Sequence, residues 1–285
     1  MKKINILFAS ALILLSAGCK DAKAGIKDGK TEIMKVGSTS ITKGDLYRQM
    51  FAASGADTAL ANSSNAIAAL EIERTAEIEE EAESSLSFYK MYYGDQFDSY
   101  LKSAGISEEE YKEQMIQSIM GSKLTGKYVG DEYETVCGSY NPIQATVLEF
   151  PAEEDADAAL SKLKDGTATA AEISQEYVLT QSGSPEIITI NTLSYDASAL
   201  SLIRSSSKDD GWQKIASSAG DKWYLVQVNE TDINAFKDEA VKTISGYSEV
   251  INDATSYFYK KYNFHVYDID LLNAVREKEP LALNQ

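Results

Sequence analysis

The sequence predicts an α+β protein in which the two ends of the chain form one mainly helical, discontinuous domain and a smaller α+β domain is inserted between them. Three observations lead to this prediction. Residues 60–124 favour helix almost throughout, residues 143–150 form a strand-like run, and a helical stripe returns from Ala235 to Lys261. Because each end contributes helices and one short strand, we expect the ends to pack together with their short strands paired.

The first residues predict export from the cytoplasm. Lys2 and Lys3 precede an apolar run that stops at three small residues, 16–18, directly before Cys19. A run this short is typical of a signal peptide rather than a membrane span. Residues 1–18 resemble a bacterial lipoprotein signal, although Ser16 stands where a leucine is usual. We expect removal of residues 1–18 and lipidation of Cys19; the alternatives are cleavage nearby or an uncleaved anchor.

Charge narrows the classes of partner. Loss of Lys2 and Lys3 from the 27 basic residues leaves 25 against 44 acidic ones, so the net charge falls from −17 to −19. Nucleic-acid binding needs clustered lysine and arginine, which excludes nucleic acid as the expected partner. Anionic lipid headgroups are repelled as well, so membrane attachment would depend on the lipid on Cys19.

The N-terminal part is expected to open as tether, strand and helix. Residues 19–31 are polar and aperiodic, as in a flexible tether. Residues 31–41 alternate as one short strand, and Thr42 and Asp45 have the spacing of a helix cap. Ser107 and Glu110 have the spacing of a second cap, a capping box. We assign residues 32–138 and 233–285 to the helical domain.

The inserted domain is assigned to residues 139–232. Its expected elements are a strand at 143–150, helices at 152–164 and 170–177, and a closing strand at 223–228. After it, one helix is expected at 235–261, followed by a short strand at 264–267.

Three patches of sequence resemble the extracytoplasmic foldases of the PrsA and SurA type, in which a parvulin-like domain is inserted in a helical chaperone domain. The patches are residues 36–46, 106–114 and 258–267, which are similar to the family's opening strand and helix, an inner helix start, and its closing segment. The resemblance implies a membrane-anchored chaperone that binds unfolded or nascent secreted proteins.

The resemblance also indicates where a parvulin-type prolyl isomerase would carry its histidines. By this alignment Val147 and Tyr224 stand at the two positions. Isomerisation by such domains depends on a polar, histidine-containing cluster beside an apolar pocket for proline. We therefore expect a retained parvulin fold without catalytic residues; a divergent but active peptidyl-prolyl isomerase is the alternative.

No cofactor or metal site is expected. His265 is the only histidine, and the carboxylates of residues 77–83 lie in a glycine-free helical run, unlike a calcium loop. A solvated helix face is the better interpretation of that run. Cys137 is interpreted as a buried thiol, and it could pair with Cys19 only if Cys19 is not lipidated.

Aromatic residues provide the candidate binding site. Tyrosine and methionine suit promiscuous apolar recognition, and residues 88–100 contain more of them than one helical stripe can bury. The candidate client-binding residues are Phe88, Tyr89, Met91, Tyr92, Tyr93, Phe97 and Tyr100. A second aromatic group lies at residues 257–267, and most of the residues in both groups are expected to form ordinary core between the N- and C-terminal helices.

A third functional class is a solute-binding lipoprotein of a transporter. That class requires two similar α/β lobes, whereas residues 60–124 contain no expected strand.

Overall fold

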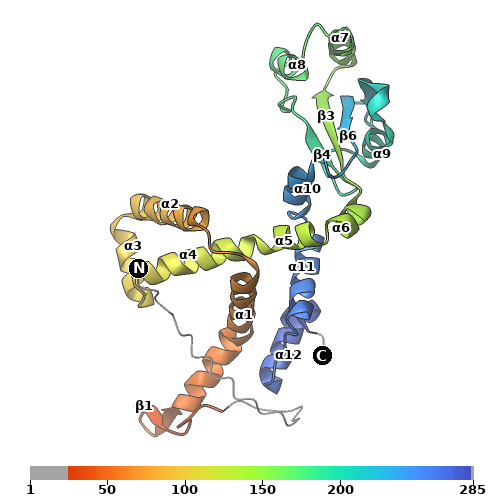
Figure 1. Cartoon of the computed structure of the whole chain (residues 1–285). Coiled ribbons are helices and arrows are strands. Elements are labelled where there is room, and N and C mark those ends of the chain that lie inside the picture. Colours follow the sequence, from red (N-terminus) through yellow and green to blue (C-terminus); the bar gives the residue numbers. More distant parts are fainter. Residues whose placement is uncertain (1–24, 284–285) are drawn as a thin grey trace, which may run out of the picture. The chain divides into compact units, whose positions relative to one another are not determined.

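A computed structural model describes residues 25–283 of the chain (Figure 1). Within these residues the predicted α+β class is confirmed, with many helices and two small antiparallel sheets. The chain divides into two compact units. One consists of the described parts of Met1–Ser63 and Tyr259–Gln285, and the other is Ser64–Phe258. The expected limits of the inserted domain, residues 139 and 232, remain a prediction.

The first unit brings the two ends of the chain together, as predicted. It contains the hairpin β1 (Glu32–Val36) and β2 (Thr39–Thr42), most of α1 (Lys43–Glu71), the end of α11 (Ser248–Lys261), α12 (Ile269–Lys278) and the short helix η2 (Pro280–Ala282). Lys278 Nζ lies 2.6 Å from a carboxylate oxygen of Asp57, and the hydroxyl of Tyr259 donates to the carbonyl of Leu60 at 3.5 Å.

Two expectations about the strands of this unit are wrong in detail. The single strand expected at 31–41 is a hairpin, because Gly37 adopts a φ of +60° and reverses the chain. Residues 264–267 form no strand. Their apolar alternation reflects packing instead. Val266 is buried, and the ring centroids of Phe264 and Tyr259 lie 4.4 Å apart.

The start of α1 follows the predicted cap. The amide of Thr42 donates to Asp45 Oδ2 at 2.9 Å, and the amide of Asp45 donates back to Thr42 Oγ1 at 3.2 Å. The hydrogen bond from the Thr42 backbone is the main cause that lowers the pKa of Asp45.

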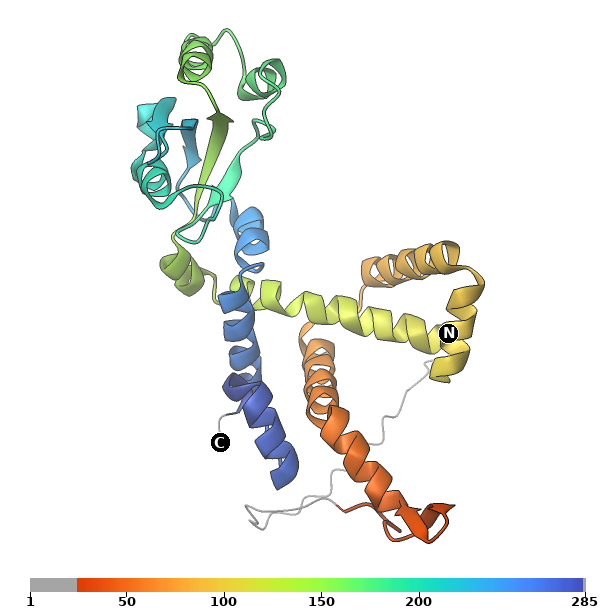
Figure 2. The ribbon, with the colours of Figure 1, turned by 180° about the vertical axis from the view of Figure 1, so that it is seen from behind.

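The second unit contains a series of helices before its sheet (Figures 1 and 2). These are α2 (Ala76–Tyr93), α3 (Asp95–Ala104), α4 (Glu108–Ser122), α5 (Leu124–Asp131) and α6 (Tyr133–Tyr140). Helix α6 ends at Tyr140; the next residue, Asn141, adopts a left-handed conformation and is followed by Pro142. The chain then enters the sheet.

The sheet is antiparallel, in the order β4-β3-β6-β5. Its strands are β3 (Ile143–Phe150), β4 (Glu186–Ile188), β5 (Gln213–Ala216) and β6 (Trp223–Glu230). One face packs on α9 (Ala197–Ser205), and the other packs on α7 (Glu153–Lys164) and α8 (Ala170–Glu176). The short helix η1 (Lys208–Asp210) precedes β5. The described residues thus hold one sheet domain and a hairpin, and they lack the two similar lobes that a solute-binding lipoprotein requires.

The helix expected at 235–261 is divided into α10 (Lys237–Ile244) and α11. The break falls at Ser245 and Gly246, residues that weaken a helix. Beyond it, the Tyr247 hydroxyl forms a hydrogen bond of 2.7 Å with the hydroxyl of Thr189.

The carboxylate of Glu230 organises the turn between β6 and α10, and this predicts a pH dependence. It accepts from the amides of Thr231 and Asp232 at 2.9 and 3.1 Å and from Lys208 Nζ at 2.9 Å. The backbone hydrogen bonds and Lys208 lower the pKa of Glu230 from 4.5 to about 2. A lowered pKa in the folded state means that this contribution is present above pH 4.5 and is lost as the pH falls toward about 2.

We therefore predict that Glu230→Gln lowers the melting temperature at pH 7 and flattens its decline between pH 4.5 and about 2. The exposed Glu134, which has no side-chain hydrogen bond in the described chain, supplies the control Glu134→Gln. Scanning calorimetry across this range is the measurement. Parallel pH profiles for the wild type and Glu230→Gln would contradict the assignment.

Candidate functional site

The helices α2, α3 and α4 form an arm with a small core of its own. In both views α2 and α4 lie side by side, joined through α3 (Figures 1 and 2). The core of the arm consists of Leu86, Phe97 and Leu101, against which Ile106, Tyr111 and Met115 are partly buried. The Phe97 and Tyr111 rings meet edge to face, with centroids 5.3 Å apart. These contacts hold the helices together.

Local sequence fixes where each helix of the arm begins and ends. Thr75 caps α2 by accepting from the amide of Ile78, and Ser107 and Glu110 form the predicted capping box of α4. Gly94 and Gly105 have positive φ values of 50° and 67° at the two ends of α3, conformations that favour glycine. The capping box is thus confirmed.

Six of the seven candidate client-binding residues lie on the surface of this arm, so the expectation that most of this group forms core is wrong. They are Phe88, Tyr89, Met91, Tyr92, Tyr93 and Tyr100, and we call this set the aromatic surface. Met91 is 77% exposed and Tyr92 is 69% exposed. Phe97, by contrast, is only 4% exposed in the core of the arm, so it is not part of the aromatic surface.

The rings of the aromatic surface contact one another. Phe88 stacks on Tyr92 with centroids 5.8 Å apart, and Tyr89 stacks on Tyr93 at 6.0 Å. Tyr92 and Tyr93 meet edge to face at 4.8 Å. The two stacked pairs are each one turn apart on α2, as i and i+4. Neighbouring rings limit the freedom of these side chains, which reduces the entropy lost when a ligand contacts them.

Ion pairs engage three basic residues of the arm. Lys90 pairs with Glu108 at 2.8 Å, Lys112 with Glu83 at 2.6 Å, and Arg74 with Glu79 and Glu113, both at 2.9 Å. The hydrogen bond to Glu108 is the main cause that raises the pKa of Lys90. These pairs tie α2 to α4, although exposed pairs of this kind add little stability.

The two positions expected from the sequence to align with the parvulin histidines lie inside a core. Val147 on β3 and Tyr224 on β6 are each 2% exposed, and both face α9 in one apolar cluster. The Tyr224 ring meets the Tyr195 ring edge to face at 5.4 Å. Burial is the main cause that raises the pKa of both phenols, so both are neutral near pH 7.

A cavity of about 340 Å³ adjoins Tyr224. Its polar lining includes Tyr195, Asp196, Ser217, Asp221 and Lys222. The Ser217 hydroxyl donates to Asp221 at 2.8 Å and accepts from the amide of Asp221 at 3.2 Å. Lys222 pairs with Glu149 at 2.8 Å. The hydroxyl and the amine are thus already engaged by carboxylates.

A second cavity, of about 750 Å³, lies between the loop after β4 and the junction of α10 and α11. Leu193 in its lining is 96% exposed, and Ile190 and Tyr247 line it as well. Sequence reasoning missed this loop. The only sequence feature that could have indicated this loop is the apolar residue Leu193 among polar neighbours. A single apolar residue of this kind is common on protein surfaces and does not identify a site.

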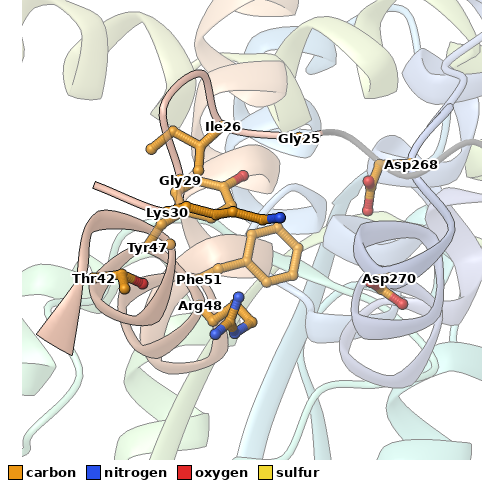
Figure 3. A pocket seen from close by; sticks show the side chains of 11 residues that line it. Gly25, Ile26, Gly29, Lys30, Thr42, Tyr47, Arg48, Phe51, Asp268 and Asp270 are labelled. Atoms are coloured by element: carbon orange, nitrogen blue, oxygen red, sulfur yellow. The ribbon is translucent and has the colours of Figure 1, made fainter. Parts of the chain in front are cut away.

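The first unit has a cavity of about 710 Å³ beside the start of α1 (Figure 3). The rings of Tyr47 and Phe51, with centroids 6.0 Å apart, lie on one side. Asp268 and Asp270 lie on the opposite side. Gly44 permits the close approach of the preceding segment, because a Cβ there would lie 2.8 Å from the carbonyl oxygen of Gly29.

The remaining candidate residues lie apart from these sites. Cys19 falls outside the described residues. Cys137 is a buried free thiol whose pKa is raised by burial, and His265 is exposed beside the Tyr267 ring. Within residues 25–283, no group of three histidine, cysteine or acidic side chains is arranged to hold a metal ion. None of the described helices combines the length and the apolar character that a membrane crossing needs.

Comparisons with known proteins agree with the predicted resemblance. No protein-family model matches the chain. A curated relative is 26% identical over 182 residues, which are 62% of this chain and 57% of the relative. It is a foldase, and the chain is therefore similar to foldases. The relative is the foldase protein PrsA 1 of Listeria innocua serovar 6a, which confirms the predicted similarity to PrsA-type foldases.

Solved structures similar to this chain are also PrsA proteins. The Bacillus cereus structure, a peptidylprolyl isomerase (PrsA), has a TM-score of 0.47 at 18% identity and covers 89% of this chain and 100% of its own. The Streptococcus pneumoniae foldase has a TM-score of 0.44 at 17% identity and covers 86% and 98%. The Bacillus subtilis PrsA has a TM-score of 0.39 at 20% identity and covers 86% and 97%.

The contrast between buried Phe97 and exposed Tyr92 predicts different effects on stability. Phe97→Ala should lower the free energy of unfolding by about 3–5 kcal/mol, because it leaves a cavity in the core of the arm. Tyr92→Ala should lower it by less than about 1 kcal/mol, because the ring is largely in water. Urea unfolding followed by circular dichroism measures both. Equal losses would show that the two rings have similar burial and would contradict the arrangement.

Proposed function

We propose that this chain is an extracytoplasmic chaperone of the foldase class that holds unfolded secreted proteins on the aromatic surface. The observation that carries the proposal is the exposure of six large aromatic or methionine side chains on an arm whose core is complete without them. Exposed apolar groups at this density mark interaction surfaces in proteins that are otherwise soluble. Similarity to a PrsA foldase supports the same conclusion.

Unfolded chains suit this surface because they offer scattered apolar side chains rather than one defined shape. Tyrosine rings give a large contact area with two rotatable bonds each, and Met91 adapts to irregular partners. Such contacts are individually weak and depend little on sequence. Because the contacts are weak and depend little on sequence, the surface can hold many different clients and release them by dissociation.

The proposal places the protein outside the cytoplasm, attached to a membrane through lipid on Cys19. Support comes from the sequence of residues 1–19. Each methylene of an acyl chain contributes about 0.8 kcal/mol on transfer into the bilayer. With a formal charge of −19 after loss of residues 1–18, the lipid rather than the protein surface would supply the attachment.

The parvulin-like domain is proposed to be non-catalytic. Support comes from Val147 and Tyr224, which are buried among apolar residues at the positions aligned with the family's histidines. Val147 has no polar group, and Tyr224 is a phenol whose pKa is raised by burial. Neither exchanges a proton readily near pH 7.

The holding function predicts a specific loss on substitution of the most exposed side chains. The triple variant Phe88→Ser, Met91→Ser and Tyr92→Ser should suppress aggregation of a chemically unfolded client about tenfold less effectively, since a loss of about 1.4 kcal/mol in binding is tenfold in affinity. Light scattering during dilution of the client from denaturant is the measurement.

A matched control removes exposed apolar side chains elsewhere. The control is a triple variant, Val178→Ser, Leu202→Ser and Tyr267→Ser, which changes three exposed residues outside the arm. This control should retain full suppression. Equal loss in both triple variants, or no loss in either, would refute the aromatic surface as the client-binding site.

The non-catalytic domain makes a second prediction. The purified protein should leave the cis–trans relaxation of a proline-containing peptide at its uncatalysed rate, which takes tens to hundreds of seconds. Protease-coupled or NMR exchange assays measure this rate. Acceleration that disappears in Tyr224→Phe would overturn the proposal and establish the cavity beside Tyr224 as a divergent active site.

A further inference from the structure

The outer face of α2 carries carboxylates in line with aromatic rings. Glu77, Glu81, Phe88 and Tyr92 follow one another at spacings of four, seven and four residues, which place them on one face of an α-helix. All four side chains are exposed. The opposite face of the helix buries Ile78, Ala82 and Leu86. One continuous surface therefore changes from acidic to aromatic along the helix.

These carboxylates are not neutralised by the arm itself. In the part of the chain that the structure describes, no ion pair engages Glu77, Glu80 or Glu81. The lysine nearest the rings in sequence, Lys90, is paired with Glu108 at 2.8 Å. The acidic end of this face therefore has an unbalanced negative charge directed to solvent.

Geometry relates the two ends of the face to the spacing of a ligand. With a rise of about 1.5 Å per residue, Glu81 is about 10 Å and Glu77 about 16 Å from Phe88 along the helix axis. An extended polypeptide advances about 3.3 Å per residue. A bound segment that contacts the rings thus reaches the carboxylates about three to five residues further along.

Resting on the proposed chaperone function, we infer that this face selects unfolded segments in which lysine or arginine lies three to five residues from an apolar or aromatic cluster. Charge complementarity identifies the occupant: the rings take the apolar side chains, and Glu77 and Glu81 take the cations. Acidic segments are repelled, as are anionic lipid headgroups.

This charge-dependent selection differs from non-specific apolar binding because it depends on the salt concentration. Exposed charges are screened over about 10 Å at 0.1 M ionic strength, whereas contacts between apolar groups are not weakened by salt. A cationic segment should therefore lose its advantage at high salt and keep only the apolar part of its affinity.

The test uses short fluorescent peptides with an identical apolar cluster. Four residues from the cluster they carry two arginines, two glutamates or two serines, and a fourth peptide has its two arginines next to the cluster. Fluorescence anisotropy with the purified protein gives each dissociation constant at ionic strengths of about 0.01 and 1 M, where screening lengths are about 30 and 3 Å.

The arginine peptide with the four-residue spacing should bind about tenfold more tightly than the glutamate peptide at low salt and equally at high salt. Glu77→Gln with Glu81→Gln should reduce this preference about fivefold and leave the serine peptide unaffected. The control Glu134→Gln with Glu154→Gln makes the same charge change on α6 and α7 and should preserve the preference.

Two outcomes would overturn the inference, and they differ in what they imply for the proposed function. Equal binding of the arginine and glutamate peptides, with aggregation suppression still dependent on Phe88, Met91 and Tyr92, refutes the charge selection and leaves the chaperone function standing. Absence of binding by any peptide, together with aggregation suppression that is indifferent to the aromatic surface, refutes both.

Discussion

The packing of Leu86, Phe97 and Leu101 at the centre of the α2–α3–α4 arm is the contact on which the proposed site depends. Burying each of these side chains contributes about 1.5–3 kcal/mol, and partly buried Tyr111 and Met115 complete the cluster. The core uses one ring of the crowded segment, Phe97, and leaves the other candidate rings exposed. An arm that is already stable can present Tyr92 and Met91 to solvent, because its folding does not require them.

The sheet domain shows the opposite use of similar residues. Tyr195 and Tyr224 meet edge to face inside it, and Val147 and Val226 pack beside them on the α9 face of the sheet. Val147 and Tyr224, the two positions expected from the sequence to align with the parvulin histidines, contribute to this core.

Much of the architecture could be predicted from the sequence because local signals and tertiary structure agree. The caps at Thr42 and Ser107, the strand at 143–150 and the turn after Tyr140 all have short-range causes. Other features depend on contacts that no local pattern contains. Gly94 resets the helical phase between Tyr93 and Phe97, so the division of one aromatic run into core and surface required the fold.

The remaining differences have similar causes. The break at Gly246 accompanies a hydrogen bond between Tyr247 and Thr189, residues far apart in sequence. Residues 264–267 alternate as a strand would, but they form no strand; Phe264 packs on Tyr259 of α11, and Val266 is buried. The exposed loop around Leu193 had no periodicity to reveal it. Its position beside α10 and α11 makes it the rival surface for an unfolded client.

Site-specific photocrosslinking tests the central claim most directly. A benzoylphenylalanine placed at position 91, at position 193 or at the control position 154 on α7 would be irradiated in the presence of an unfolded client. The account predicts that the client is captured mainly from position 91. Capture from position 193 or 154 with none from position 91 would contradict it.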